Sequence, residues 1–100
     1  MKRVLLLDDD PIQLSVRQLL LRRGGVESEV ATSAQEALEL LTAKSFGAVI
    51  TDHLMPDING DEFVRKLRLL DERMPVIVVS GLPDIDDAYR GLDVVILCKP

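Results

Sequence analysis

Length, composition and charge restrict what this chain can be. It has 100 residues, of which 47% are hydrophobic and 3% aromatic, and its formal net charge is −5. This length suits one small domain. The hydrophobic fraction excludes a disordered chain, and the low aromatic content predicts an aliphatic core. The negative charge argues against nucleic-acid or anionic-membrane binding by this segment. A single cysteine excludes an internal disulfide, and the apolar run 4–7 is too short for a signal peptide or a membrane span, so we expect a cytoplasmic protein.

Strand and helix patterns then alternate along the chain. Apolar runs predict strands over 3–7, 26–31, 46–51, 76–79 and 94–97. Helical spacing with capping and stop signals predicts helices over 11–23, 33–44 and 60–70, and a short one over 84–89. In the first helix the recurring apolar residues are Ile12, Val16, Leu19 and Leu20. This alternation predicts a parallel sheet with helices on both faces, and the weakly alternating run 26–31 is expected at its edge.

Polar residues follow four of the five predicted strands at the point where each strand ends. Asp8 and Asp9 follow the first strand, Asp52 the third, Ser80 the fourth and Lys99 the fifth. Because the carboxyl ends of parallel strands lie along one edge of a sheet, we expect these residues to converge there. Asp52 ends a buried strand just before a loop, which makes it the first candidate for a reacting group.

Three carboxylates at one edge repel one another, and a divalent cation removes this conflict. Mg²⁺ prefers oxygen ligands, usually one or two carboxylates with water and a phosphate. Asp8, Asp9 and Asp52 would supply the carboxylates, Ser80 a hydroxyl and Lys99 a positive charge. Together these groups would bind a transferring phosphoryl group, and a carboxylate among them would accept it as an aspartyl phosphate.

Several other residues that carry chemistry have simpler interpretations. Asp10 is expected to cap a helix. The group Asp57, Asn59 and Gly60 is expected to make a turn. We expect the single histidine, His53, in a solvent-facing loop, Tyr89 at the edge of the core and Cys98 as a small core or rim residue.

Taken together, these residues resemble the receiver domain of two-component response regulators, a CheY-like family. The resemblance covers essentially the whole chain, 1–100, as one domain, and its segments 4–11, 51–60 and 99–100 match in order and spacing. It implies an α/β fold of the flavodoxin-like type, a doubly wound five-stranded parallel sheet with strand order 2-1-3-4-5. It also implies a cis peptide bond between Lys99 and Pro100.

The resemblance further implies a role for each site residue. Asp52 would accept a phosphoryl group from a phosphohistidine on a partner histidine kinase or phosphotransfer protein. Mg²⁺ or Mn²⁺ would be held by Asp8, Asp9, Asp52 and the backbone carbonyl of Leu54. Ser80 would be the switch hydroxyl that moves to a phosphoryl oxygen, and Lys99 would pair with the phosphoryl group. Such a domain catalyses only its own phosphorylation and dephosphorylation, so no other enzyme activity is expected.

The chain departs from the family in four respects. Ile96 stands where the family has an aromatic switch residue, and the segment 80–99 is shorter than usual. Leu54 and Leu82 occupy positions that tune hydrolysis in the family, and their apolar side chains predict slow loss of phosphate. The family continues past the Lys-Pro pair with a fifth helix that covers one sheet face. We expect either a truncated chain or, if 100 residues is the complete product, self-association through the uncovered apolar face.

Two other functions stay open. Haloacid-dehalogenase-type hydrolases carry a second aspartate two residues after the nucleophile, as in Asp8 and Asp10, but here a capping insertion is lacking and Asp52 is left unexplained. A degenerate receiver would act as a binding module without phosphorylation. Ile96 and the short segment 80–99 favour that reading, whereas the complete set of site residues argues against it. No G-x-G-x-x-G follows the first strand, which excludes a dinucleotide-binding fold.

Overall fold

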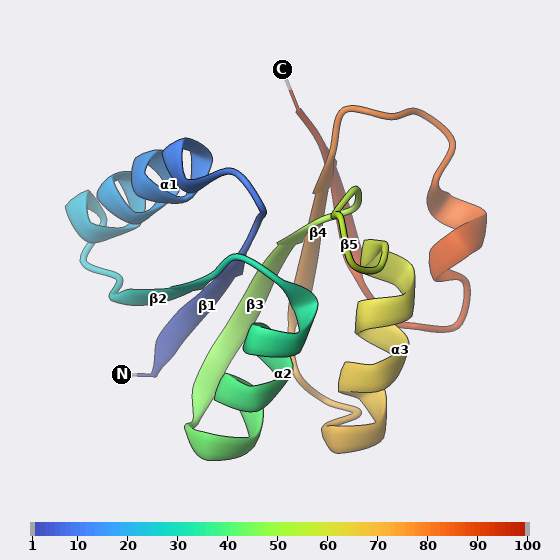
Figure 1. Ribbon diagram of the computed structural model, residues 1–100, viewed down its shortest axis with the longest axis horizontal. Coiled ribbons are helices and arrows are strands. Elements are labelled where there is room, and N and C mark those ends of the chain that lie inside the picture. Colours follow the sequence, from blue (N-terminus) through green and yellow to red (C-terminus); the bar gives the residue numbers. More distant parts are fainter. Residues whose placement is uncertain (1, 100) are drawn as a thin grey trace.

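The computed structural model describes residues 2–99, in which strands and helices alternate (Figure 1). The strands are β1 (Arg3–Leu7), β2 (Ser28–Ala31), β3 (Phe46–Asp52), β4 (Val76–Ser80) and β5 (Val95–Cys98). The helices are α1 (Pro11–Arg23), α2 (Ala34–Ala43), α3 (Gly60–Leu70) and the 3-10 helix η1 (Asp86–Tyr89). All strand pairs are parallel and the order is β2-β1-β3-β4-β5, which confirms the predicted doubly wound, flavodoxin-like fold. The expected cis bond involves Pro100 and lies outside the described residues.

The middle of the sheet is buried on both sides. Leu5, Leu6 and Leu7 of β1 are fully buried, as are Val49 of β3 and Val78 of β4. Buried parallel strands of this kind need helices on both faces. The β1-to-β2 crossover places α1 on one face, and the chain then crosses the sheet in the opposite direction, which places α2 and α3 on the other (Figure 1).

Helix α1 has a capped N-terminus, and the side of it that faces the sheet is partly polar. The Asp10 carboxylate accepts the Ile12 N–H at 2.9 Å, as predicted for a cap. Leu14 is the buried residue of α1, and Arg17 and Gln18 are half-buried. Arg17 donates to Asp8 Oδ2 at 2.9 Å and Gln18 donates to the Ser28 carbonyl at 3.3 Å, so polar contacts help to hold α1 to the sheet.

The apolar stripe of α1 faces outward. Four residues of this stripe are 50–73% exposed: Ile12, Val16, Leu19 and Leu20. On β5, Ile96 packs against the core beneath α2 and α3, so Val95 and Leu97 point to the face of α1, where they are 57% and 49% exposed. Within residues 2–99 no fifth helix covers this face, in line with the expectation of an uncovered apolar face. Self-association through it stays a prediction.

Two predicted elements begin two residues later in the structure. β2 begins at Ser28, because the Val26 N–H still donates to the Leu21 carbonyl at 2.8 Å and continues the end of α1. The short helix predicted over 84–89 is the 3-10 helix η1. Asp84 lies outside it because its φ of +58° is not helical.

Two arginines of α3 hold the chain between β4 and β5. The Arg68 guanidinium donates to the carbonyl oxygens of Leu92, Asp93, Met74 and Asp71 at 2.8, 2.9, 2.7 and 3.2 Å. Arg65 donates to the Ala88 carbonyl at 2.9 Å. This short segment is therefore attached to α3 by hydrogen bonds from charged donors to its backbone.

The described helices are short. The longest, α1, has 13 residues, whereas a membrane-spanning helix needs about 20 predominantly apolar residues. Among residues 2–99, none of the helices has the length and apolar character required to cross a membrane.

Candidate functional site

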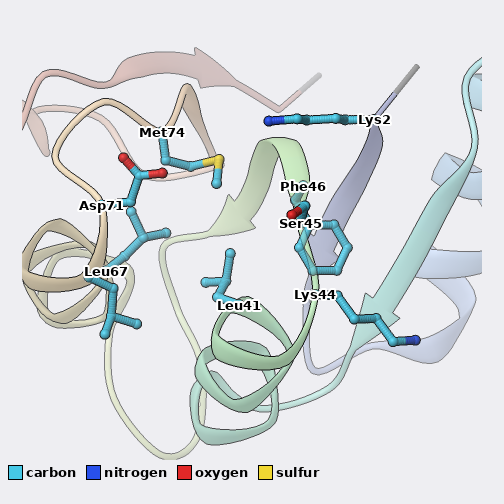
Figure 2. A pocket seen from close by; sticks show the side chains of 9 residues that line it. Lys2, Leu41, Lys44, Ser45, Phe46, Leu67, Asp71 and Met74 are labelled. Carbon is cyan, nitrogen blue, oxygen red and sulfur yellow. The ribbon is translucent and has the colours of Figure 1, made fainter.

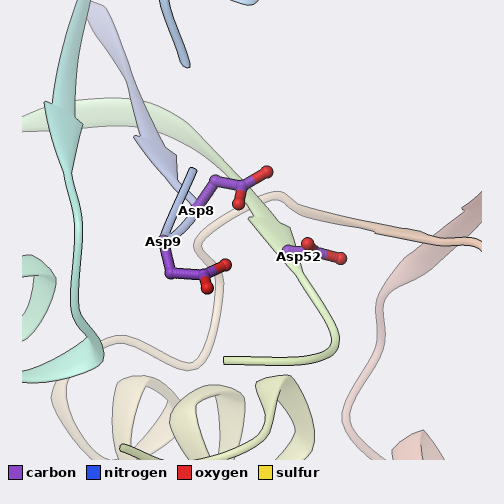
Figure 3. Close-up of side chains that lie close together, drawn as sticks. All are labelled: Asp8, Asp9 and Asp52. Carbon is purple, nitrogen blue, oxygen red and sulfur yellow. The ribbon is translucent and has the colours of Figure 1, made fainter. Parts of the chain in front are cut away.

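Three carboxylates meet at the carboxyl ends of two neighbouring strands (Figure 3). Leu7 of β1 lies opposite Thr51 of β3, so Asp8 and Asp52, the next residues, are neighbours. One oxygen from each of Asp8, Asp9 and Asp52 lies within 4.8 Å of the others. Asp8 and Asp52 are 1% and 7% exposed, whereas Asp9 is an exposed residue. The cluster is therefore open to solvent on the side of Asp9.

Both oxygens of Asp8 already have partners. Oδ1 accepts the backbone N–H of Asp10 at 3.0 Å, and Oδ2 accepts from the Arg17 guanidinium at 2.9 Å. The side chains of Asp8 and Arg17 are 2% and 17% exposed, so this ion pair is largely buried. Arg17 is not among the residues predicted from sequence, because a lone arginine in a helix is usually solvent-exposed.

Asp52 is likewise held at both oxygens. Oδ1 accepts the backbone N–H of His53 at 2.8 Å, and Oδ2 accepts from Lys99 Nζ at 3.0 Å. The Lys99 N–H donates to the Ser80 carbonyl at 2.8 Å, which joins the ends of β4 and β5. The Ser80 side chain is buried, and its Oγ accepts the Leu82 N–H at 3.0 Å. All five residues predicted from the strand ends therefore lie at this edge of the sheet.

Two leucines lie beside these polar groups. Leu54 follows Asp52 by two residues and is 50% exposed, and Leu82 follows Ser80 by two residues and is 43% exposed. The backbone carbonyl of Leu54, a predicted metal ligand, lies in the loop that begins directly after β3. Neither leucine side chain can donate or accept a hydrogen bond, so neither can orient a water molecule.

The charges of the cluster fit a cation. Among residues 2–99, its three carboxylates face two paired cations, Arg17 and Lys99, so one negative charge of the cluster has no cationic partner there. Displacement of water, followed by interaction with Asp8 and the charge of Asp52, raises the pKa of the Asp9 carboxyl above its usual value. Clustered carboxylate oxygens are the ligands that Mg²⁺ prefers. The residues present are therefore suited to the divalent cation predicted from the sequence.

His53 is buried, so the prediction of a solvent-facing position is wrong. It is 8% exposed, and its Nδ1 lies 2.7 Å from the hydroxyl of Tyr89 on η1. The two rings meet edge-on with centroids 5.5 Å apart. Gly60 lies against this pair: a Cβ there would overlap the Tyr89 hydroxyl and come within 2.7 Å of the Asp52 carbonyl oxygen. The partner that buries His53 lies 36 residues away in sequence, beyond any local pattern.

Two further residues differ in detail from their simplest interpretation. Asp57 does more than make a turn, because its carboxylate accepts the Ala34 N–H at 3.0 Å and so helps Ser33 to cap α2. Cys98 lies exposed at the end of β5, at the rim of the sheet and not in the core. Neither residue belongs to the acidic cluster.

A pocket at the opposite end of the sheet is separate from this cluster (Figure 2). It has a volume of about 200 Å³, and its lining includes Lys2, Leu41, Phe46, Leu67 and Met74. Phe46 begins β3 and Asp52 ends it, so the length of a strand separates the pocket from the carboxylates. The pocket therefore adds nothing to the chemistry at the rim.

Comparison with known proteins gives a consistent relationship. Residues 4–97 match the family described as the response regulator receiver domain. The transcriptional regulatory protein PrrA of Mycobacterium bovis is 36% identical over 91 residues, and the cell cycle response regulator CtrA of Brucella ovis is 30% identical over 90 residues. These matches cover 91% and 90% of this chain but 39% of each relative, so the chain spans about two-fifths of their length.

Solved structures show the same similarity. The response regulator protein TrrA from Thermotoga maritima, solved in complex with Mg²⁺-BeF, is 25% identical with a TM-score of 0.91, covering 100% of this chain and 88% of that one. A response regulator receiver protein from Pseudomonas putida is 31% identical with a TM-score of 0.91, covering 99% of this chain and 86% of that one. The similarity therefore includes the rim that carries the carboxylates.

Proposed function

Because this chain belongs to the response regulator receiver domain family, we propose that Asp52 accepts a phosphoryl group from a phosphohistidine on a partner histidine kinase or phosphotransfer protein. The observation that carries the proposal is the setting of Asp52. It ends a buried strand, lies in a cluster of carboxylates within 4.8 Å, and accepts from Lys99 Nζ at 3.0 Å. An Asp52 oxygen bonds to phosphorus, the P–N bond to histidine breaks, and the released imidazole takes up a proton.

The same cluster is the proposed metal position. Asp8, Asp9 and Asp52 would supply carboxylate oxygens, and the backbone of Leu54 would supply a carbonyl oxygen. When bound, Mg²⁺ or Mn²⁺ neutralises the charge that develops on the transferring phosphoryl oxygens. The complex of the Thermotoga maritima relative with Mg²⁺-BeF supports this assignment.

Lys99 and Ser80 would respond to the new charge. Phosphorylation adds a charge of about −1.5 to −2 and three acceptor oxygens next to Lys99 Nζ, which already pairs with Asp52 Oδ2. The Ser80 hydroxyl accepts the Leu82 N–H and keeps its own proton free for donation, so it would move to a phosphoryl oxygen. Bonds that form in only one state bias the chain after β4 toward one conformation.

The proposed output is a protein contact of the segment that follows Ser80. Ile96 is half-buried at the position of the aromatic switch, so coupling would run through the backbone and aliphatic packing. The net charge of −5 fits a protein partner better than nucleic acid for this segment. We place the domain in the cytoplasm, where the exposed thiol of Cys98 stays reduced.

A binding module that works without phosphorylation is the second candidate. Ile96 and the short η1 favour it, because both remove features with which the family transmits its signal. The hydrolase alternative is weaker, since the Asp10 carboxylate caps α1 at the Ile12 N–H and lies outside the acidic cluster.

Intact mass spectrometry after incubation with Mg²⁺ and acetyl phosphate tests the leading proposal. Wild type is expected to gain one phosphoryl group, and removal of Mg²⁺ with EDTA should prevent the gain. Asp52→Ala should gain none. Asp57→Ala, which removes another acid from the same loop, is the matched control and should be phosphorylated.

The outcomes separate the candidates. No mass gain in folded wild type would overturn the proposal and favour the binding module. A gain in Asp52→Ala would place the acceptor on another residue. Transfer from a phosphorylated histidine phosphotransfer protein then tests the phosphohistidine donor directly.

A further inference from the structure

Arg17 places a positive charge inside the acidic cluster. Its guanidinium lies 2.9 Å from Asp8 Oδ2, and 17% of its side chain is exposed. We propose that Arg17 is a built-in counter-ion of this site, which stabilises the metal-free domain and competes with the divalent cation for Asp8. This inference rests on the proposed function, because it concerns the same metal position.

The metal-free cluster needs this charge. Asp8 is 1% exposed, and an unpaired carboxylate at such a position is strongly unfavourable. Its partners are the Asp10 N–H, which is neutral, and Arg17, which is charged. Lys99 is engaged with Asp52 at 3.0 Å. Arg17 is therefore the cation that compensates Asp8.

The same contact opposes a second cation at Asp8. Each Asp8 oxygen already accepts a hydrogen bond, so a metal ion at Oδ2 must share that atom with the guanidinium or displace it. The guanidinium charge of Arg17 at the Asp8 carboxylate repels a divalent cation that binds the same carboxylate. Burial limits the screening of this repulsion by salt. Removal of the Arg17 charge should therefore strengthen cation binding.

If Arg17 mainly held Asp8 in position for the metal ion, its removal would weaken cation binding instead of strengthening it. Groups that hydrogen-bond to a metal ligand often raise metal affinity by fixing the ligand's position. Here the backbone N–H of Asp10 holds Asp8 Oδ1 at 3.0 Å independently of Arg17, and the surrounding burial restricts the side chain further. We therefore expect repulsion to outweigh orientation.

The test measures Mg²⁺ affinity and metal-free stability in the same variants. Mg²⁺ is titrated into isotope-labelled protein, and the backbone amide NMR signals of Asp10 and His53 report binding. Arg17→Gln removes the charge and Arg17→Lys keeps it. Arg23→Gln is the matched control, because it removes an exposed arginine from the end of the same helix. Urea midpoints are recorded with EDTA and with saturating Mg²⁺.

Arg17→Gln is expected to bind Mg²⁺ roughly tenfold more tightly than wild type, as repulsion at this range implies. Without metal it should unfold at lower urea than wild type, and Mg²⁺ should narrow that difference. Arg17→Lys and Arg23→Gln should bind Mg²⁺ within about threefold of wild type. Arg17→Lys keeps the positive charge beside Asp8, and Arg23→Gln removes an exposed charge that solvent and salt already screen.

Equal or weaker Mg²⁺ binding by Arg17→Gln overturns the inference and leaves the proposed function intact. The absence of any Mg²⁺ response in wild type overturns the proposed function itself. If Arg17→Gln does not fold without metal, its recovery by Mg²⁺ supports the inference. Tenfold tighter binding by Arg17→Lys overturns it, because that variant retains the charge.

Discussion

The Nδ1 atom of His53 lies 2.7 Å from the hydroxyl oxygen of Tyr89, and both side chains are buried. This hydrogen bond links the residue after Asp52 to η1, the helical turn between β4 and β5. His53 also donates its backbone N–H to Asp52 Oδ1 at 2.8 Å. One residue therefore connects the proposed acceptor carboxylate with the segment that follows Ser80.

Tyr89→Phe is expected to destabilise the domain by about 1–2 kcal/mol, because His53 Nδ1 would stay buried without its partner. Burial, followed by the charges of Asp61 and Asp52, raises the pKa of the Tyr89 hydroxyl, so this hydroxyl keeps its proton across the neutral range. The urea midpoint measures the loss. In a double-mutant cycle with His53→Leu the two losses should not add, and additive losses would contradict a direct interaction.

Gly60→Ala is expected to destabilise the fold by about 1–3 kcal/mol, as overpacking of a filled space does. The added Cβ would overlap the Tyr89 hydroxyl and lie 2.7 Å from the Asp52 carbonyl oxygen. Gly81→Ala is the control, because an added Cβ there has no atom within 4 Å. Similar urea midpoints for the two variants would contradict the close packing at Gly60.

The strands and the residues that end them could be predicted from the sequence. Buried parallel strands are continuous apolar runs, which leave few alternatives for a segment such as 76–79. The approach of Lys99 to Asp52 then follows from topology, because parallel strands bring their carboxyl ends to one edge. Residues that are distant in sequence therefore come together at this edge, and the strand order alone is enough to predict it.

The side of α1 that meets the sheet could not be predicted in this way. Val16 and Leu19 lie outside while Arg17 turns inward to Asp8, because helical spacing identifies a stripe but not the layer that it meets. His53 is misplaced for a related reason. Its burial depends on Tyr89, 36 residues away, and only the completed fold brings the two together.

Arg68→Ala should loosen the chain between β4 and β5. The side chain donates to four backbone carbonyls, among them those of Leu92 and Asp93 at 2.8 and 2.9 Å. The free energy of unfolding is expected to fall by about 2–4 kcal/mol. Hydrogen bonds to charged groups contribute about 1.5–3 kcal/mol each, and water replaces part of the lost bonds. Hydrogen exchange should accelerate over 86–93 more than in β1. Arg73→Ala, at an exposed arginine nearby, should leave both measurements unchanged.

Asp9 should make the stability of the metal-free domain depend on pH. Its raised pKa means that the folded state holds the proton more tightly than the unfolded state. The ionised Asp9 carboxylate therefore lowers the free energy of unfolding above its folded-state pKa. This destabilisation is lost as the pH falls below the ordinary carboxyl pKa. Relative to Asp9→Asn, metal-free wild type should gain stability as the pH is lowered from neutral.

Thermal midpoints of wild type and Asp9→Asn in EDTA, between about pH 4 and pH 7, check this expectation around the ordinary carboxyl pKa. Mg²⁺ should raise the wild-type midpoint at neutral pH and have a smaller effect on Asp9→Asn, because the amide oxygen that remains carries no negative charge to attract the cation. A difference between the variants that does not change with pH would contradict the expectation.

If Asp52 is phosphorylated as proposed, Leu54 and Leu82 predict a long-lived aspartyl phosphate. They follow Asp52 and Ser80 by two residues each and are 50% and 43% exposed, and an apolar side chain cannot hold a water for attack. A positioned acid or base contributes roughly 10²–10⁴-fold to such steps, so its absence slows hydrolysis.

Leu54→Gln and Leu82→Gln should each shorten the phosphate half-life several-fold, because an amide can orient water where leucine cannot. The half-life is read as the decline of the phosphorylated mass after the phosphodonor is removed. Leu69→Gln changes a leucine that is 88% exposed on α3 and should leave the half-life unchanged. Decay of the wild-type phosphate within seconds, without a phosphatase, would show that water reaches Asp52 in an attacking geometry despite both leucines.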